Sequence, residues 1–141
     1  MIAQDSGNRG NESHLLSVLG RLEAEHGEPL AALDHLTRAI RNYHDSGNPS
    51  NMGGPLAIFA ALLDRIGHYE PAAVIADYGL SPLTAEAFPE IRAAIAHLRG
   101  VLGEEAYESF ARKGETMTAT EMAAYAYDQI DQARTTLQQL R

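Results

Sequence analysis

The sequence predicts an all-α fold, a right-handed stack of antiparallel helix hairpins with about seven helices. Apolar residues recur at three- and four-residue steps, which is the period of an amphipathic helix. No stretch alternates apolar and polar residues in the manner of a half-buried strand, and glycines and prolines separate the apolar stretches. A polar Asp-Ser-Gly-Asn motif at residues 5–8 returns at residues 45–48, which indicates a structural unit that is used twice.

The two copies agree beyond this motif at the same spacing of forty residues. The matching pairs are Asn11 and Asn51, Leu16 and Leu56, Leu22 and Leu62, Gly27 and Gly67, and Ala32 and Ala72. Each copy has the order polar turn, apolar helix, glycine corner and second apolar helix. Because glycine adopts the left-handed backbone conformation at low cost, Gly27 and Gly67 are predicted to be bends between antiparallel helices.

In the first copy, residues 1–10 show no apolar period and are expected to be a loose lead-in or the trailing end of a preceding element. Asn11 is expected to cap a helix that begins at Glu12. The predicted core face of this helix is Leu15, Leu19, Leu22 and His26, widened by Leu16 and Val18. Pro29 suits the start of the next helix, for which the predicted core face is Leu33, Leu36, Ile40 and Tyr43.

In the second copy, Gly53, Gly54 and Pro55 predict an irregular start, with a regular helix only from Leu56. Its predicted core face is Phe59, Leu62, Leu63 and Ile66. A shorter partner helix is expected to begin near Ala72, and three residues are expected to end it: Gly79, Ser81 and Pro82.

We expect residues 1–141 to form a single domain, with the two repeats in 11–79 and capping helices in 84–141. Pro89 suits a first helical position, followed by an apolar stripe of Ile91, Ile95, Leu98 and Leu102. The next short helix is expected to stop at Gly114. Thr118 and Glu121 have the spacing of a capping box at the start of a long closing helix. The predicted apolar stripe of that helix is Met122, Ala126, Ile130, Ala133, Leu137 and Leu140.

Both copies share a set of small and apolar residues at fixed positions. They are Leu19-Gly20, Gly27, Ala32, Leu36 and Ala39-Ile40 in the first copy, and Phe59-Ala60, Gly67-His68-Tyr69 and Ala72 in the second. In these positions the copies resemble a tetratricopeptide repeat. Two positions depart from the family pattern, since Glu23 stands where an aromatic residue is usual and His44 where a proline is common. The resemblance implies a scaffold of paired helices that binds a protein or peptide.

The C-terminal part contains three distinctive segments, Leu102–Tyr107, Lys113–Thr118 and Glu121–Ala123. In these segments it resembles the end of large actinobacterial regulators. These regulators are LuxR-type proteins and related cyclase-like ATPases, in which an NTPase domain precedes a tetratricopeptide-like region. The resemblance implies that this chain is the final segment of such a transcriptional regulator or a stand-alone version of it. No P-loop motif occurs here, so ATPase activity does not carry over.

Composition and motifs argue against several classes of function. The formal net charge of −8 and the lack of a basic run disfavour direct binding to nucleic acid or to an anionic membrane. Without cysteine there is no thiolate metal site, and a cytoplasmic location is expected. The six histidines form no His-Glu-x-x-His motif, and no serine has a recognisable base and orienting carboxylate. We therefore expect no catalytic residue, metal or cofactor.

In paired-helix repeats, the first helix of each pair lines a concave surface. The side of these helices away from the predicted core faces is therefore the predicted partner groove. Its residues are His14, Ser17, Arg21 and Glu25 from the first copy, and Ala57, Ala61, Asp64 and Arg65 from the second. The alternative is that these residues are only the polar side of surface helices.

The function that this pattern favours is a non-catalytic protein–protein interaction module of a regulatory protein. With only two repeats, we expect a homodimer or docking against an upstream NTPase domain. The alternative is a domain that senses a ligand or peptide in the groove, with Arg21 and Arg65 as anchors. A small helical enzyme and a DNA-binding protein are less favoured.

Overall fold

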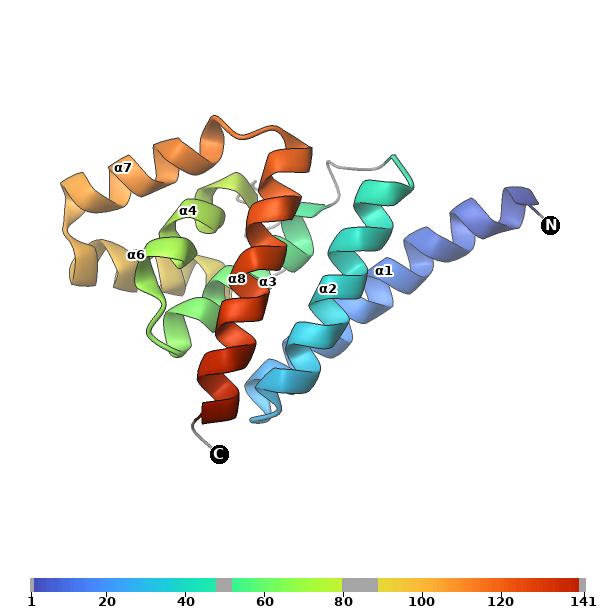
Figure 1. The fold of residues 1–141 in the computed structure, drawn as a ribbon, viewed down its shortest axis with the longest axis horizontal. Coiled ribbons are helices and arrows are strands. Elements are labelled where there is room, and N and C mark those ends of the chain that lie inside the picture. Colours follow the sequence, from blue (N-terminus) through green and yellow to red (C-terminus); the bar gives the residue numbers. More distant parts are fainter. Residues whose placement is uncertain (1, 48–51, 80–88, 140–141) are drawn as a thin grey trace.

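The computed structural model describes residues 2–47, 52–79 and 89–139, and within these ranges it contains seven α-helices and no strand (Figure 1). The helices are α1 (Ile2–Glu25), α2 (Pro29–Asp45), α3 (Gly53–Arg65), α4 (Tyr69–Gly79), α6 (Glu90–Leu102), α7 (Glu104–Glu115) and α8 (Ala119–Gln139). The prediction of an all-α chain with about seven helices is confirmed. Among the described helices, none combines the length and apolar character that crossing a bilayer requires.

The first four helices form two hairpins with the same corner. Gly27 and Gly67 adopt φ angles of +82° and +86°, in the left-handed region that favours glycine. In the first corner the Glu28 N–H donates to the Glu23 carbonyl at 2.8 Å, and in the second the His68 N–H donates to the Leu63 carbonyl at 2.9 Å. The prediction that both glycines are bends between helices is confirmed.

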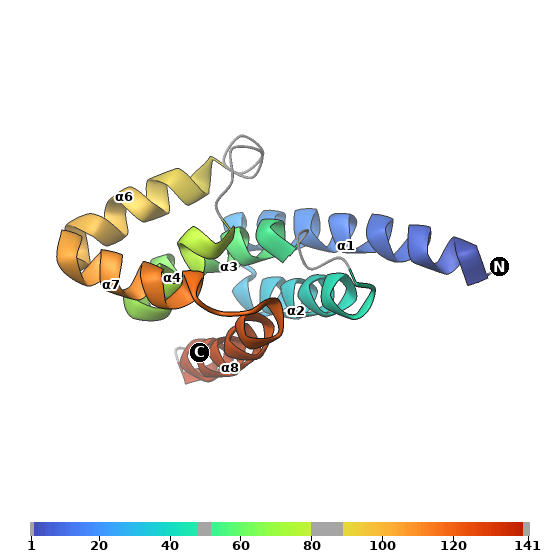
Figure 2. The same cartoon turned by 90° about the horizontal axis from the view of Figure 1, so that it is seen from above.

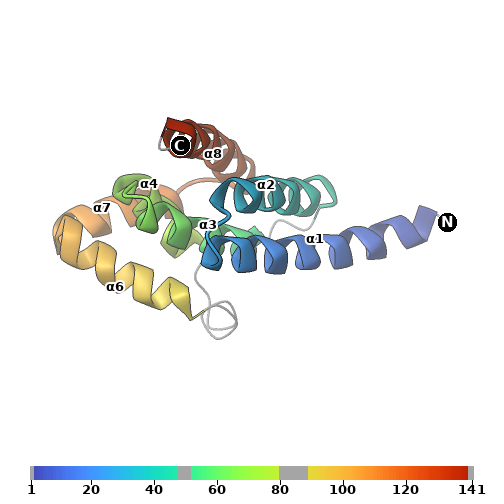
Figure 3. The same cartoon turned by 90° about the horizontal axis from the view of Figure 1, so that it is seen from below.

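The helices pack in layers around α3. Helices α1, α3 and α6 lie on one side, α2 and α4 lie behind them, and α8 runs across the far side of α2 and α4 (Figures 2 and 3). Helix α3 contacts α1, α2, α4 and α6, and every residue from Pro55 to Leu63 is buried. The main apolar cluster includes buried residues of α2, α3, α4, α6, α7 and α8, whereas α1 adds to it only the partly buried Ala24. Helix α1 is therefore peripheral to the core.

The closing helix α8 begins as predicted. The Thr118 N–H donates to Glu121 Oε1 at 2.8 Å, and the Glu121 N–H donates to Thr118 Oγ1 at 3.1 Å, which completes the capping box. The stripe residues Met122, Ala126, Ile130 and Ala133 are buried, and Leu137 packs partly buried against the core. The predicted positions Asn48, Asn51, Ser81, Pro82 and Leu140, and the predicted start of the capping region at 84, lie outside the described residues.

Three predicted helix starts are wrong. Helix α1 runs from Ile2 through Asn11, because extending a helix whose other half is packed adds one hydrogen bond per residue without a new nucleus. Helix α3 is regular from Gly53, since Pro55 lies in the first turn, where the backbone N–H has no intrahelical partner to lose. For the same reason α4 begins at Tyr69, ahead of its proline.

Gly114 does not end α7, which continues to Glu115. The residue is buried against α4, and a Cβ atom at this position would lie 1.9 Å from the carbonyl oxygen of Val74. The glycine is needed for the close approach of two helices rather than for a turn, and the prediction that it stops the helix is wrong.

Candidate interaction surface

Four apolar side chains of α1 form a row that is left partly or largely exposed in the part of the chain that the structure describes. They are Leu15, Val18, Leu19 and Leu22, which share one helix face because they are three and four residues apart. We call this row the α1 stripe. Leu15 is 57% exposed and Leu22 is 44% exposed, while Val18 and Leu19 are partly buried. Together with Val101, these two leucines are the exposed large apolar side chains of the described residues.

The α1 stripe corrects the predicted core face of α1. The face of α1 that packs against the rest of the fold instead consists of Leu16, Ser17, Gly20 and the partly buried Ala24. A Cβ atom on Gly20 would lie 2.9 Å from Leu36 Cγ of α2, so the glycine permits a close contact between the two helices. The predicted core face followed the most hydrophobic row of α1. The contact between α1 and α2 instead uses small residues, because they let the two backbones approach.

The second repeat shows what this stripe looks like when it is covered. Forty residues on, the equivalent positions in α3 are Pro55, Ile58, Phe59 and Leu62, and all four are buried. Helix α3 has neighbours on each side in its layer, whereas α1 lies at the end of that layer (Figure 3). The α1 stripe thus occupies positions that are core in the second repeat. In the first repeat, no helix within the described residues covers them.

The predicted groove residues do not form one surface. Ser17, Ala57 and Ala61 are buried, at 3%, 0% and 6% exposure, so the prediction that they line a groove is wrong. His14 and Glu25 are exposed. The predicted groove does not form because α6 packs against α3 where the groove was expected.

The charged members of the predicted groove make contacts between helices instead. Arg21 Nε donates to Glu90 Oε2 of α6 at 2.5 Å, and the same nitrogen lies 3.6 Å from Glu25 Oε1. Arg65 donates to the carbonyl oxygen of Ala24 at 2.9 Å. Asp64 Oδ1 lies 2.7 Å from His97 Nδ1 of α6. Both arginines that were expected to anchor a ligand therefore connect neighbouring helices.

Four histidines lie at contacts between segments of the fold. The pairs are His35 with Glu23, His44 with Thr120, His68 with Thr136, and His97 with Asp64. His44 and His68 contact opposite ends of α8, at 3.0 Å and 3.1 Å. In the part of the chain that the structure describes, no three His, Cys, Asp or Glu side chains are grouped to hold a metal ion.

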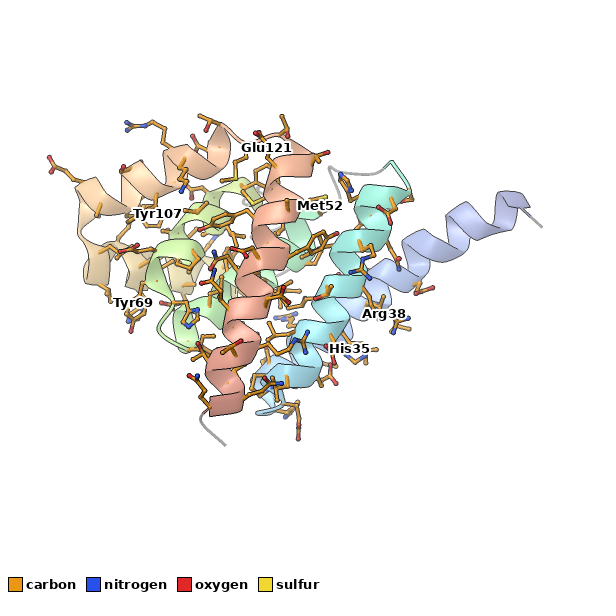
Figure 4. The ribbon with its side chains drawn as sticks, in the orientation of Figure 1. His35, Arg38, Met52, Tyr69, Tyr107 and Glu121 are labelled. Atoms are coloured by element: carbon orange, nitrogen blue, oxygen red, sulfur yellow. The ribbon has the colours of Figure 1, made fainter. Side chains whose placement is uncertain are left out.

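A second surface is a shallow cleft of about 530 Å³ between α2 and α8. Its lining residues are Ala31, Asp34, His35, Thr37, Arg38, Arg41 and Arg134. Arg134 pairs with Asp34 at 2.8 Å, Arg38 lies 3.3 Å from Glu12, and the Arg41 guanidinium lies 5.8 Å from the ring centre of Tyr127. Figure 4 shows His35 and Arg38 on α2, where their contacts with Glu23 and Glu12 place them beside α1. Three arginines in one cleft of an acidic chain can attract a carboxylate or phosphate.

Tyr107 joins α7 to α4 inside the fold (Figure 4). Its hydroxyl donates to Asp77 Oδ1 at 2.9 Å, and the Arg99 guanidinium lies over its ring at 4.3 Å. Burial, and next the hydrogen bond to Asp77, raise the pKa of the phenol above its ordinary value. Because the hydroxyl is held inside the fold, we assign Tyr107 a structural role.

No protein-family model, curated protein or solved structure matches this chain.

Proposed function

We propose that this chain is a non-catalytic protein–protein interaction module of a regulatory protein and that it binds its partner through the α1 stripe. The observation that carries the proposal is the exposure of Leu15 and Leu22 at positions whose counterparts in α3 are core. Removing apolar surface from water is worth roughly 25 cal/mol per Å², so covering this stripe favours association. Contiguous exposed apolar side chains commonly mark interaction sites.

The two hairpins with matching corners support a tetratricopeptide-like scaffold as the framework of this module. The C-terminal resemblance supports its placement in a LuxR-type or cyclase-like ATPase regulator, in the cytoplasm and behind an NTPase domain. The coding sequence adjacent to the gene tests this placement: an NTPase domain there supports it, and an unrelated gene argues against it.

Affinity capture with matched variants tests the interaction function. We expect Leu15→Asp/Leu22→Asp to lose a partner that the unaltered chain captures and that Val101→Asp still captures. Val101 is the matched control because it is 46% exposed and lies on α6, away from the stripe. The partner is identified by mass spectrometry and its binding is repeated with purified proteins. Equal binding by both variants would contradict the proposal.

A second candidate function is recognition of an anionic ligand, such as an acidic peptide, in the cleft between α2 and α8. The three arginines of this cleft favour it, and they replace Arg21 and Arg65 as the anchoring residues. Titration with a poly-glutamate peptide, followed by NMR, should shift the α2 and α8 resonances. Arg38→Gln/Arg134→Gln should weaken the binding, and unchanged spectra would exclude this function for that peptide class.

A further inference from the structure

We infer that the α1 stripe binds the α1 stripe of a second copy of this chain, with the two helices antiparallel and a two-fold axis beside Leu19. The inference rests on the proposed interaction function and names its partner. It is carried by two features of α1: the position of the apolar side chains along the stripe and the charges on its two flanks.

The apolar side chains are placed symmetrically about a point between Val18 and Leu19, with Leu15 and Leu22 at the two ends. A two-fold axis between these two central residues, beside Leu19, brings Leu15 against Leu22 of the partner subunit, while Val18 and Leu19 fill the centre. Such an interface uses the same patch on both chains, which is the usual form of a homodimer contact. The two most exposed leucines of the stripe then cover each other.

The flanks of the stripe are complementary to themselves. Helical spacing places exposed Glu12 and His26 on one flank, seven residues before and after Leu19, and exposed His14 and Glu25 on the other. An antiparallel two-fold pair keeps each flank on its own side and reverses its direction. Glu12 then faces His26 of the partner subunit, and His14 faces Glu25 of the partner subunit. An imidazole donates a hydrogen bond to a carboxylate in either of its protonation states.

The surroundings of these four residues leave room for such contacts. His26 continues the last turn of α1, since its N–H donates to the Leu22 carbonyl at 2.9 Å. Glu12 accepts only long hydrogen bonds from Arg38 and Asn42, both at 3.3 Å, and its side chain is 47% exposed. The Glu25 side chain is 40% exposed beside Arg21.

The antiparallel direction follows from the helix dipoles. Acidic and histidine side chains would also meet in a parallel pair, but parallel helices place like dipole ends together, whereas antiparallel helices place opposite ends together. The paired segment from Glu12 to His26 extends roughly 20 Å at 1.5 Å per residue. Because this contact is small compared with a stable interface of roughly 1,600 Å², we expect a concentration-dependent dimer with a Kd on the order of micromolar.

Analytical ultracentrifugation of the full chain between about 1 and 100 µM tests self-association. We expect a monomer–dimer equilibrium with a dissociation constant that rises at least about ten-fold in Leu15→Gln/Leu22→Gln and stays unchanged in Val101→Gln. Circular dichroism of each variant checks that the helices are retained, as expected for exposed positions. A chain that stays monomeric at every concentration, or a dimer that the double variant does not weaken, would overturn the inference.

Two further sets of variants test the geometry. His14→Glu should weaken the dimer, because it places two carboxylates together, and adding Glu25→Lys should restore it. Since the chain has no cysteine, Leu15→Cys mixed with Leu22→Cys should form a disulfide-linked dimer, whereas Leu15→Cys alone should not. Cross-linking of Leu15→Cys alone, without the mixed product, would overturn the antiparallel pairing.

The results also separate this inference from the function on which it rests. A monomeric chain that still loses another captured protein in Leu15→Asp/Leu22→Asp would overturn the second-copy inference and leave the interaction function standing. If neither self-association nor capture depended on the α1 stripe, both would be wrong.

Discussion

The hairpin of α1 and α2 and the hairpin of α3 and α4 have the same corner but are buried to different extents. Gly27 and Gly67 have nearly the same φ angle, and most of the backbone hydrogen bonds around them join equivalent residues. Yet Leu62 of α3 is 3% exposed, whereas Leu22, its counterpart in α1, is 44% exposed. The local sequence determines the corner, but the neighbours of each hairpin determine which face of its first helix becomes core.

The largest expected effect comes from truncating the matched leucines. Leu62→Ala should lower the free energy of unfolding by about 3 kcal/mol, because it leaves a cavity in the core. Leu22→Ala should cost less than about 1 kcal/mol in the monomer, because its side chain is already partly in water. Urea unfolding at low protein concentration measures both. Equal losses would show that the α1 stripe is covered within the single chain.

A smaller contrast is expected at two buried glycines in helices. Gly114→Ala should destabilise the fold by about 2 kcal/mol, since the new methyl group would meet the Val74 carbonyl, which belongs to the backbone and cannot move cheaply. Gly20→Ala should change stability by less than about 1 kcal/mol, because it meets the flexible Leu36 side chain and gains helix propensity. Thermal unfolding of the two variants gives the comparison, and a larger loss for Gly20→Ala would contradict it.

The two corners should respond alike. Gly27→Ala and Gly67→Ala should each cost about 1 kcal/mol, because both require a positive φ angle and neither new methyl group would meet a neighbour. Chemical denaturation of the two single variants and of the double variant should show nearly additive losses. A cost at only one corner would mean that the hairpins are less alike than their backbones indicate.

An effect of similar size is expected at Tyr107. Its partner Asp77 corresponds in the first hairpin to Thr37, which donates to the Leu33 carbonyl within its own helix. Tyr107→Phe should lower the free energy of unfolding by about 1 kcal/mol at neutral pH, because Asp77 loses the hydrogen bond that the Tyr107 hydroxyl donates.

The pH dependence at Tyr107 follows from its raised pKa. The unfolded chain loses this proton near pH 10, before the folded chain does, so the stabilisation is complete below pH 10 and falls as the pH rises through the folded pKa. Burial likewise raises the pKa of Tyr43 and Tyr78, so a weaker alkaline decline should persist in Tyr107→Phe. Urea unfolding from pH 7 to pH 11 measures both slopes, and identical slopes would contradict the assignment.

The features that depend on local chemistry could be predicted from the sequence. The helical period gives the fold class, the corner glycines give both bends, and the Thr118–Glu121 spacing gives the cap of α8. In each case the residues that determine the feature lie within a few positions of one another.

The buried face of α1 could not be predicted in this way. Its most apolar row, from Leu15 to Leu22, faces outward, and the helix contacts α2 through Leu16 and Gly20. Hydrophobic periodicity locates a helix and its apolar side, but close helix packing also selects small residues that the periodicity does not weigh. Gly114 was misread for the same reason, as a stop signal instead of a packing position.

The predicted groove does not form, because residues far apart in the sequence contact one another where it was expected. The pairs Asp64 with His97 and Arg21 with Glu90 join residues 33 and 69 positions apart, and they form because α6 packs beside α3 and reaches α1. No local pattern in the sequence specifies that placement, so side chains predicted to face a ligand became contacts between helices.

Cysteine labelling can distinguish an α1 stripe that is open in the single chain and covered by association from one that is covered within the chain. The chain has no cysteine of its own, so Leu22→Cys and Leu62→Cys can each be alkylated without background. We expect rapid native-state modification of Leu22→Cys in dilute solution, slower modification at high protein concentration, and modification of Leu62→Cys only on unfolding. Equal protection of both positions in dilute solution, or no effect of concentration or a bound partner on Leu22→Cys, would contradict this expectation.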